Sequence, residues 1–255
     1  MQSSNITRVQ CTRNYICNSC HPAPTLSPLH FVNVSYGKHL VFLGDSVSAQ
    51  VECDYRQALA DGFIFANKVS RKGAYYSSIS ASSKYIQIGC PWRCKHNNSE
   101  SLYIKNLGHV LSNSSTTHII LNIGSHYNMS LFQSSLPIYK DFLNAMKDHG
   151  IHIIIRTLGF THFASSPTGD FKLKPNNIST RIKCVPIQNH LDSIIIKQNL
   201  LLQELAYNLS VNIMDISGLS DDYMSHATSK DCRHLCQNCD MIRAWNSLLL
   251  RYIES

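Results

Sequence analysis

One serine of this 255-residue chain stands where a nucleophile could work. Ser46 closes the tripeptide Gly44-Asp45-Ser46, which directly follows an apolar run, and a helix is predicted after it. A serine between the carboxyl end of a strand and the start of a helix is open to substrate, and backbone N–H groups there can stabilise an oxyanion. The alternative is structural: Ser46 caps the helix, while Asp45 makes a turn.

A histidine and a carboxylate near the other end of the chain would complete the chemistry of a serine nucleophile. Asp231 stands three residues before His234, and in a turn or the first step of a helix their side chains can touch. The acid would fix the tautomer of the histidine, whose other ring nitrogen would take the proton of Ser46. The chain holds 13 histidines, so the pair taken alone is better explained as surface residues in a cysteine-tied loop.

Five short apolar runs, rich in β-branched residues, alternate with stretches that favour helices. Strands are predicted at 39–43, 84–88, 118–123, 151–156 and 211–216. Helices are predicted at about 48–60, 101–111, 131–148, 191–208 and 241–253. The runs are continuously apolar, which is typical of parallel strands covered on both faces. The sequence therefore predicts an α/β fold, a three-layer α/β/α sandwich with a central, mostly parallel five-stranded sheet.

The N-terminal segment differs from the rest of the chain. Residues 1–37 carry three cysteines and three prolines with little periodicity, and we interpret them as a cysteine-containing leader packed on a main domain of residues 38–255. Residues 164–183 are rich in Pro, Gly, Asn and Ser and are predicted as a long surface loop. No apolar run approaches the roughly 18 residues of a membrane span, so we expect no membrane anchor in this chain.

Cysteines and glycosylation triplets indicate the compartment. Ten cysteines suit five disulfides, and seven Asn-x-Ser/Thr triplets accompany them, which favours a glycoprotein of the secretory pathway, in the Golgi lumen or secreted. Residues 1–30 contain no signal peptide, and we expect a leader outside this chain. Cys17-x-x-Cys20 and Cys236-x-x-Cys239 leave a four-thiolate zinc site open as the alternative.

The charge pattern argues against nucleic acid as a partner. Lys plus Arg number 23 and Asp plus Glu 16, which gives a net charge of +7. The basic residues are scattered, with no run of five, whereas a nucleic-acid site gathers them on one face. The chain has no Gly-rich dinucleotide fingerprint and no phosphate loop, so no cofactor is predicted.

Several blocks of residues, in order along the chain, resemble one known family. Besides Gly44-Asp45-Ser46, they are Asn122-Ile123-Gly124-Ser125-His126-Tyr127, Arg156-Thr157 with His162-Phe163 and Cys184, Asp215-Ile216-Ser217-Gly218-Leu219-Ser220 with His226, and Asp231-Cys232-Arg233-His234-Leu235-Cys236 with Trp245-Asn246. Together they resemble the GDSL or SGNH hydrolase clan. The match is closer to its PC-esterase branch, which includes the trichome-birefringence-like polysaccharide O-acetyltransferases of plants. The chain departs from that branch where the family's Leu-Pro-Gly is replaced by Gln237-Asn238-Cys239.

The resemblance implies a catalytic triad of Ser46, His234 and Asp231. Ser46 would attack an acyl carbonyl and hold the acyl group as an ester, His234 would act as base and then acid, and Asp231 would orient the histidine. Asn122 and Gly73 would stabilise the oxyanion together with the backbone N–H of Ser46. Gly89 is the rival of Gly73 for that role.

The resemblance also implies how substrate is bound. Arg156 and His162 would line an acceptor groove, with His226 as a further candidate. For Arg156, pairing with a neighbouring carboxylate at the end of a strand is an equally good interpretation. Disulfides are favoured, with Cys232 and Cys236 bonded to different distant partners. A zinc site around those cysteines and Cys239 would instead remove the base, by making His234 a ligand.

These roles imply a carbohydrate O-acyltransferase or esterase, with acetyl as the expected acyl group. Its partners would be a glycan or polysaccharide acceptor and a small acyl donor, without a metal ion. Transfer and hydrolysis share the covalent step and differ in whether a sugar hydroxyl or water takes the acyl group. The alternative is a catalytically inactive carbohydrate-binding or structural protein that retains the fold, because a fold does not by itself prove an activity.

Overall fold

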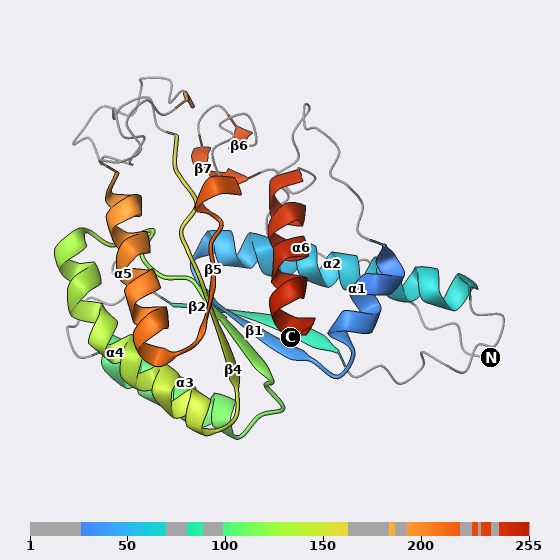
Figure 1. Ribbon diagram of the computed structural model, residues 1–255, viewed down its shortest axis with the longest axis horizontal. Helices are drawn as coiled ribbons and strands as arrows, with labels where there is room; N and C mark the ends of the chain where they lie inside the picture. The colour runs from blue at the N-terminus through green and yellow to red at the C-terminus, as the bar shows by residue number, and fades with distance from the viewer. Residues whose placement is uncertain are drawn as a thin grey trace.

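The computed structural model describes residues 27–69, 81–88, 99–162, 184–186, 193–219, 226–228, 231–235 and 240–254. A five-stranded sheet in the order β2-β1-β3-β4-β5 runs through the middle of the molecule (Figure 1), and all its neighbouring strands are parallel. The strands are β1 (His39–Gly44), β2 (Ser82–Gln87), β3 (His118–Leu121), β4 (His152–Arg156) and β5 (Asn212–Met214). Each corresponds to one of the five predicted strands, so the predicted parallel sheet is confirmed.

Helices cover both faces of this sheet. They are α1 (Pro28–Ser35), α2 (Ser46–Val69), α3 (Ser99–Ser112), α4 (Met129–Asp148), α5 (Ile194–Leu209) and α6 (Asp240–Glu254). Figure 1 shows α3, α4 and α5 on one side of the sheet and α1, α2 and α6 on the other. The predicted three-layer α/β/α arrangement is therefore confirmed. Two helix starts are fixed by capping side chains, since Asn128 accepts from Leu131 N at α4 and Ser193 accepts from Ile195 N at α5.

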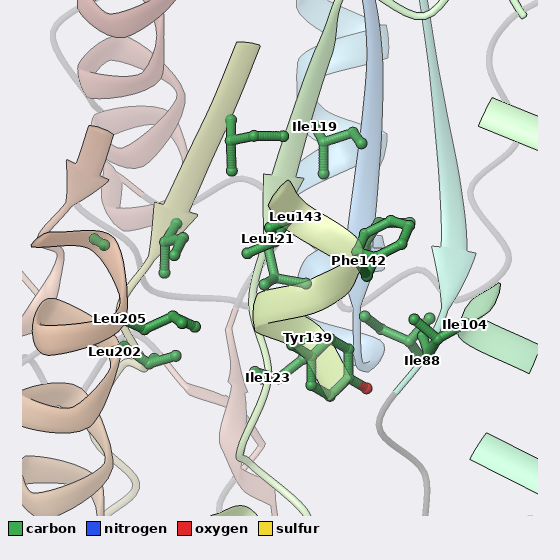
Figure 2. Packing of buried hydrophobic residues seen from close by; sticks show 14 of the residues in the cluster. Ile88, Ile104, Ile119, Leu121, Ile123, Tyr139, Phe142, Leu143, Leu202 and Leu205 are labelled. Carbon is green, nitrogen blue, oxygen red and sulfur yellow. The ribbon is translucent and has the colours of Figure 1, made fainter. Parts of the chain in front are cut away.

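Alternate residues of each central strand enter different cores. Ile119 and Leu121 of β3 pack with Tyr139, Phe142 and Leu143 of α4 (Figure 2). Ile120, between them, belongs to the second core, where it packs with the helices of the opposite face. Successive side chains of a strand point to opposite faces. A strand between two helix layers must therefore be apolar at every position, which explains the continuous runs in the sequence.

The segment before β1 contains a helix that the sequence analysis did not predict. Phe31 and Val34 of α1 are buried in the second core, and the ring of Phe31 lies 4.9 Å from that of Tyr55 in α2. Helix α1 thus packs in the second core, whereas residues 1–26 and the predicted loop at 164–183 lie outside the described residues. Among the described residues, no helix combines the length and hydropathy needed to cross a membrane.

A small antiparallel pair of strands stands where we expected a turn or the start of a helix. Strands β6 (His226–Thr228) and β7 (Asp231–Leu235) pair with each other near the starts of α5 and α6 (Figure 1). We expected a turn or the first step of a helix at 231–234. The spacing argument for contact between Asp231 and His234 does not apply in a strand, and the side chain of Asp231 lies outside the described residues.

Candidate active site

The site lies at the edge of the sheet where the strands end, called here the carboxyl edge. From β1 the chain crosses to β2 on one side, while β3, β4 and β5 follow on the other side. Open α/β sheets bind ligands at the carboxyl ends of strands where the order reverses in this way. Ser46 lies two residues after the end of β1 and Asn122 directly follows β3, so two predicted site residues stand at this reversal.

A serine and a histidine from opposite ends of the chain meet there. Ser46 is the first residue of α2, His234 lies in β7, and Ser46 Oγ is 2.6 Å from His234 Nε2. This is hydrogen-bond distance, the separation that a general base needs to take a proton from a nucleophile. Both side chains are half-buried, so a substrate can reach them.

Gly44 and Asp45 fix the turn that presents Ser46. A Cβ atom on Gly44 would lie 2.6 Å from the carbonyl oxygen of Asn122 and closer still to Ser48 Oγ, so no larger residue fits without displacing the strand or helix. Asp45 then caps α2, because its Oδ1 accepts from Val47 N at 2.9 Å and Ser48 N at 3.3 Å. The sequence therefore places the serine at the helix start for a steric reason and a capping reason.

The side chain of Gln50 joins α2 to the strand that carries His234. Its Nε2 donates to the carbonyl oxygen of Leu235 at 2.8 Å, and its Oε1 accepts from the N–H of Leu235 at 3.2 Å. Gln50 follows Ser46 by four residues, one turn of the helix, so both face the same strand. One helix thus holds the serine and the main chain beside the histidine.

The opposite side of β7 is held by a disulfide and a short segment of main chain. Cys184 and Cys232 form a disulfide with an S–S distance of 2.06 Å. The N–H of His162 donates to the carbonyl oxygen of Cys232 at 3.0 Å, and Val185 N donates to the carbonyl oxygen of His162 at 3.0 Å. The expected bond from Cys232 to a distant cysteine is confirmed, while Cys236 lies outside the described residues.

A buried cation and a buried carboxylate lie behind the pair. Arg156, at the end of β4, is 1% exposed; its Nη2 donates to Ser48 Oγ at 3.2 Å and its guanidinium lies 5.2 Å from the centre of the Trp245 ring. Burial lowers the pKa of Arg156 to about 10, and the charge of Asp45 opposes this change. Burial alone would raise the pKa of Asp45, but Ser125 and nearby positive charges outweigh it, so this pKa is lowered.

A second histidine, His126, borders the site. Among the described residues, no hydrogen bond joins it to Ser46. Nδ1 of His126 accepts a hydrogen bond of 3.0 Å from Nη1 of Arg233. Burial, followed by the charge of Arg233, lowers the pKa of His126, although Asp45 opposes the change. His126 is therefore neutral at neutral pH, with its proton on Nε2.

A cavity of about 730 Å³ adjoins these residues. Val47, which follows Ser46, is on its wall, and so are Arg233 and Leu235, which flank His234. The predicted site residues Asn122 and Arg156 also line it. The carboxyl edge therefore combines a hydrogen-bonded serine and histidine with a space that can hold a ligand.

The structure does not show the other predicted site residues in their expected roles. Both amide hydrogens of Asn122 point to main-chain carbonyl oxygens, with Nδ2 3.0 Å from the oxygen of Arg156 and 3.2 Å from that of Thr157. Its role toward an oxyanion stays a prediction that requires this amide to turn. His162 is fully buried beside β7 and is not on the cavity wall. Gly73, Gly89 and the side chain of His226 lie outside the described residues.

The disulfide removes one cysteine from the possible zinc ligands. Cys232 is bonded to Cys184 and so is not a free thiolate, which removes it from the set with Cys236 and Cys239. Within the described ranges, no three His, Cys, Asp or Glu side chains gather as a metal site requires. The paired Cys-x-x-Cys units themselves fall outside those ranges.

Sequence reasoning missed three contributors to the site: Asp45 as a buried charge, Gln50 as a link to β7, and Arg233 as the partner of His126. Asp45 was interpreted only as a turn residue, although its place before Ser46 was a usable signal. Arg233 and His126 stand inside two of the motif blocks, but nothing in the sequence pairs them with each other. Gln50 carries no local signal, because the main chain it binds lies 185 residues away.

No protein-family model matches the sequence, and no curated protein matches it. Several solved structures are similar to this chain. A GDSL-like lipase from Bacteroides thetaiotaomicron is 11% identical, with 84% of this chain and 88% of that chain covered and a TM-score of 0.44. An acetyl xylan esterase is 13% identical, with 82% and 98% covered and a TM-score of 0.47.

The periplasmic domain of a lipopolysaccharide acetyltransferase from Salmonella ser. Paratyphi A is also similar. It is 12% identical, with 91% of this chain and 92% of that chain covered and a TM-score of 0.45. Similarity at this level says nothing about the activity of this chain.

Proposed function

We propose that this chain is an SGNH-type O-acyl esterase or acyltransferase that works through an acyl-Ser46 intermediate on carbohydrate esters. One observation carries the proposal: the 2.6 Å contact of Ser46 Oγ with His234 Nε2, at the carboxyl edge and beside a cavity. A helix-capping serine needs no histidine. A serine within hydrogen-bond distance of an imidazole, with neighbouring residues on the wall of a cavity, is the arrangement that nucleophilic catalysis uses.

In the proposed first step, Ser46 Oγ attacks the carbonyl carbon of the ester while His234 Nε2 takes the proton of the hydroxyl. The C=O double bond opens to an oxyanion. When it re-forms, the bond to the leaving oxygen breaks and His234 returns the proton to that oxygen. The products are an alcohol and acyl-Ser46. Water or a second hydroxyl then attacks acyl-Ser46 with His234 again as base, which restores the serine.

The proposal assigns supporting roles on the same pattern. The N–H groups of Val47 and Ser48 already serve the cap of Asp45, which leaves the N–H of Ser46 as the proposed oxyanion donor, with Asn122 and Gly73. Asp231 would orient His234. Neither the side chain of Asp231 nor Gly73 lies among the described residues, so these assignments rest on the resemblance.

The carbohydrate substrate, the PC-esterase relationship and the compartment are likewise proposals. The ordered motif blocks support the first two. An oxidising compartment of the secretory pathway is supported by disulfides at Cys184, Cys232 and Cys53. Mapping of non-reduced peptides from native material tests the compartment, because the proposal fails if Cys184 and Cys232 are recovered as free thiols.

The first experiment is intact-protein mass spectrometry after incubation with p-nitrophenyl acetate, with Ser46→Ala as the control. A transient gain of one acetyl group, accompanied by p-nitrophenol release and absent in Ser46→Ala, is expected. Acceptor glycans then separate transfer from hydrolysis. Absence of acylation by any ester, in folded and disulfide-intact protein, would reject the enzyme and favour a binding protein that retains the fold.

A further inference from the structure

The wall of the cavity beside Ser46 is mainly apolar. Many of its apolar side chains come from the start of α4, the loop after β4, the start of α5 and the start of α6. They include Leu131, Leu158, Phe160, Ile194, Met241 and Trp245. Apolar ligand surface gains free energy by leaving water for such a wall, so the cavity selects for a hydrocarbon body.

Two amide side chains on the wall, those of Asn122 and Gln198, already bind main-chain oxygens of the protein. Nδ2 of Asn122 donates to the carbonyl oxygens of Arg156 and Thr157. Nε2 of Gln198 donates to two carbonyl oxygens of the loop after β3, at 3.0 and 3.1 Å. A sugar ring carries hydroxyl groups on most of its carbon atoms, and burial of a hydroxyl without a partner is unfavourable. The apolar part of the wall therefore suits a hydrocarbon better than a sugar ring.

Two side chains on the wall, those of Arg156 and Trp245, each carry a buried N–H group without a hydrogen-bond partner among the described residues. Arg156 lines the cavity and is 1% exposed, and its Nη1 has no hydrogen-bond partner among the residues that the structure describes. A buried N–H without a partner is costly, so an occupant that brings an acceptor oxygen is favoured. The occupant that fits both observations has an oxygen-bearing end and a hydrocarbon body.

We propose that this cavity binds the acyl chain of the ester substrate, and that the chain is a hydrocarbon of medium length, longer than acetyl. The inference rests on the proposed function and names its acyl specificity. The ester oxygens supply the acceptor, the chain covers the apolar wall, and the alcohol part, a sugar included, stays outside. The volume of about 730 Å³ supports this, since an acetyl group adds only one methyl group to the carbonyl.

A series of p-nitrophenyl esters from acetate to decanoate tests the proposal through kcat/KM for p-nitrophenol release. Each methylene group that enters the cavity should raise kcat/KM about threefold to fourfold, the factor that corresponds to burial of one methylene. The rise should end when the chain fills the cavity. A kcat/KM that is highest for acetate and falls with every added methylene would overturn the inference.

Two tryptophan variants on α5 locate the effect. Ile194 is half-buried on the cavity wall at the start of the helix, so Ile194→Trp should shorten the space without entering the core. Leu200 lies on the same helix, is 59% exposed and is not on the wall. Ile194→Trp should lower the ratio of octanoate to acetate kcat/KM by about tenfold, and Leu200→Trp should leave it unchanged. Equal ratios in the two variants would contradict the placement of the chain.

Binding to Ser46→Ala separates failure of this inference from failure of the proposed function. The variant cannot form acyl-Ser46 but keeps the cavity, so calorimetric titration should give octanoate a Kd at least about tenfold lower than acetate. Tight octanoate binding, with no acylation of native Ser46 by any ester, would support the acyl-chain site in the cavity and reject the proposed reaction. Acylation that is efficient only with acetate, with equal binding of the two acids, would reject the chain site and keep the reaction.

Discussion

Histidines lie at both edges of the sheet, but they have different surroundings at each edge. At the amino edge, where the strands begin, His39, His118 and His152 stand at the first positions of β1, β3 and β4. The rings of His118 and His152 stack with centroids 4.9 Å apart. His39 Nδ1 and Ser82 Oγ are 2.8 Å apart. These histidines contact one another or their neighbours, and none of them is on the wall of the 730 Å³ cavity.

At the carboxyl edge, His234 contacts a serine and His126 borders a cavity. Burial is the first cause of a lowered pKa in both His118 and His126, although only one of them is near a ligand site. A perturbed pKa alone therefore does not distinguish the two edges. The presence of a cavity and a nucleophile distinguishes them, which is why the site is assigned by geometry.

The largest expected contrast is in activity. His234→Gln removes the base from Ser46 and should lower kcat/KM for ester hydrolysis about a thousandfold or more. His152→Gln changes an exposed histidine at the amino edge and should leave kcat/KM within about twofold. Steady-state kinetics of the two variants provide the measurement. Similar losses in both would show that the contact between Ser46 and His234 is not catalytic.

The next contrast is in stability and concerns carboxylates. Asp45→Asn keeps an oxygen that can cap α2 but removes the charge that balances buried Arg156. The free energy of unfolding should fall by about 2–4 kcal/mol, because a buried cation loses its compensation. Asp148→Asn, exposed at the end of α4 near the amino edge, is the matched control and should cost under about 0.5 kcal/mol. Urea unfolding of both proteins measures the difference, and equal midpoints would contradict the prediction.

A third contrast is the pH dependence of stability. Burial, helped by the charge of His152, lowers the pKa of His118 to about 4 from the value of 6.5 expected in the unfolded chain. Between these values the unfolded state binds a proton that the folded state does not bind, so the free energy of unfolding falls as pH falls. The loss from this group should reach about 3 kcal/mol at pH 4.

His118→Gln removes that titration from the amino edge and should flatten the slope between pH 6.5 and 4. The pKa values of Asp45 and Asp215 are also lowered. The stability that these two carboxylates contribute is therefore lost only as pH falls below 3.8, outside this pH range. Denaturation at several pH values measures the slope. An unchanged slope in His118→Gln would show that another group controls stability between pH 6.5 and 4.

The sheet could be predicted because its signal is local. Residues 119–121 are apolar at every position since β3 lies between two helix layers, and the same holds for residues 40–43 of β1 and 153–155 of β4. Strand β7 could not be predicted in this way. Its sequence Asp-Cys-Arg-His-Leu has no apolar run, and it is held by Gln50, His162 and a disulfide that are distant in sequence.

The site also combines residues that local sequence predicts with features that it does not predict. Ser46, Asn122 and Arg156 end or follow predicted strands, so the parallel topology alone gathers them at one edge. The contact of His234 with Ser46 was predicted from residue types and the resemblance, since nothing local joins positions 188 residues apart. The cavity could not be predicted, because its wall is assembled from six separate segments, and their apolar residues are typical of an ordinary core.

The smallest contrast compares two glutamines of α2. Gln50→Met is similar in volume but removes both hydrogen bonds to Leu235, so β7 is free to shift and His234 loses its fixed distance to Ser46. We expect kcat to fall about tenfold with little change in KM, because proton transfer is sensitive to a displacement of about 1 Å. Gln57→Met removes only an exposed bond to Asp61 on the same helix and should leave kcat unchanged. A fall in kcat that is equal in both variants would assign the effect to α2 as a whole, and no fall in Gln50→Met would mean that the disulfide and His162 alone hold β7 in place.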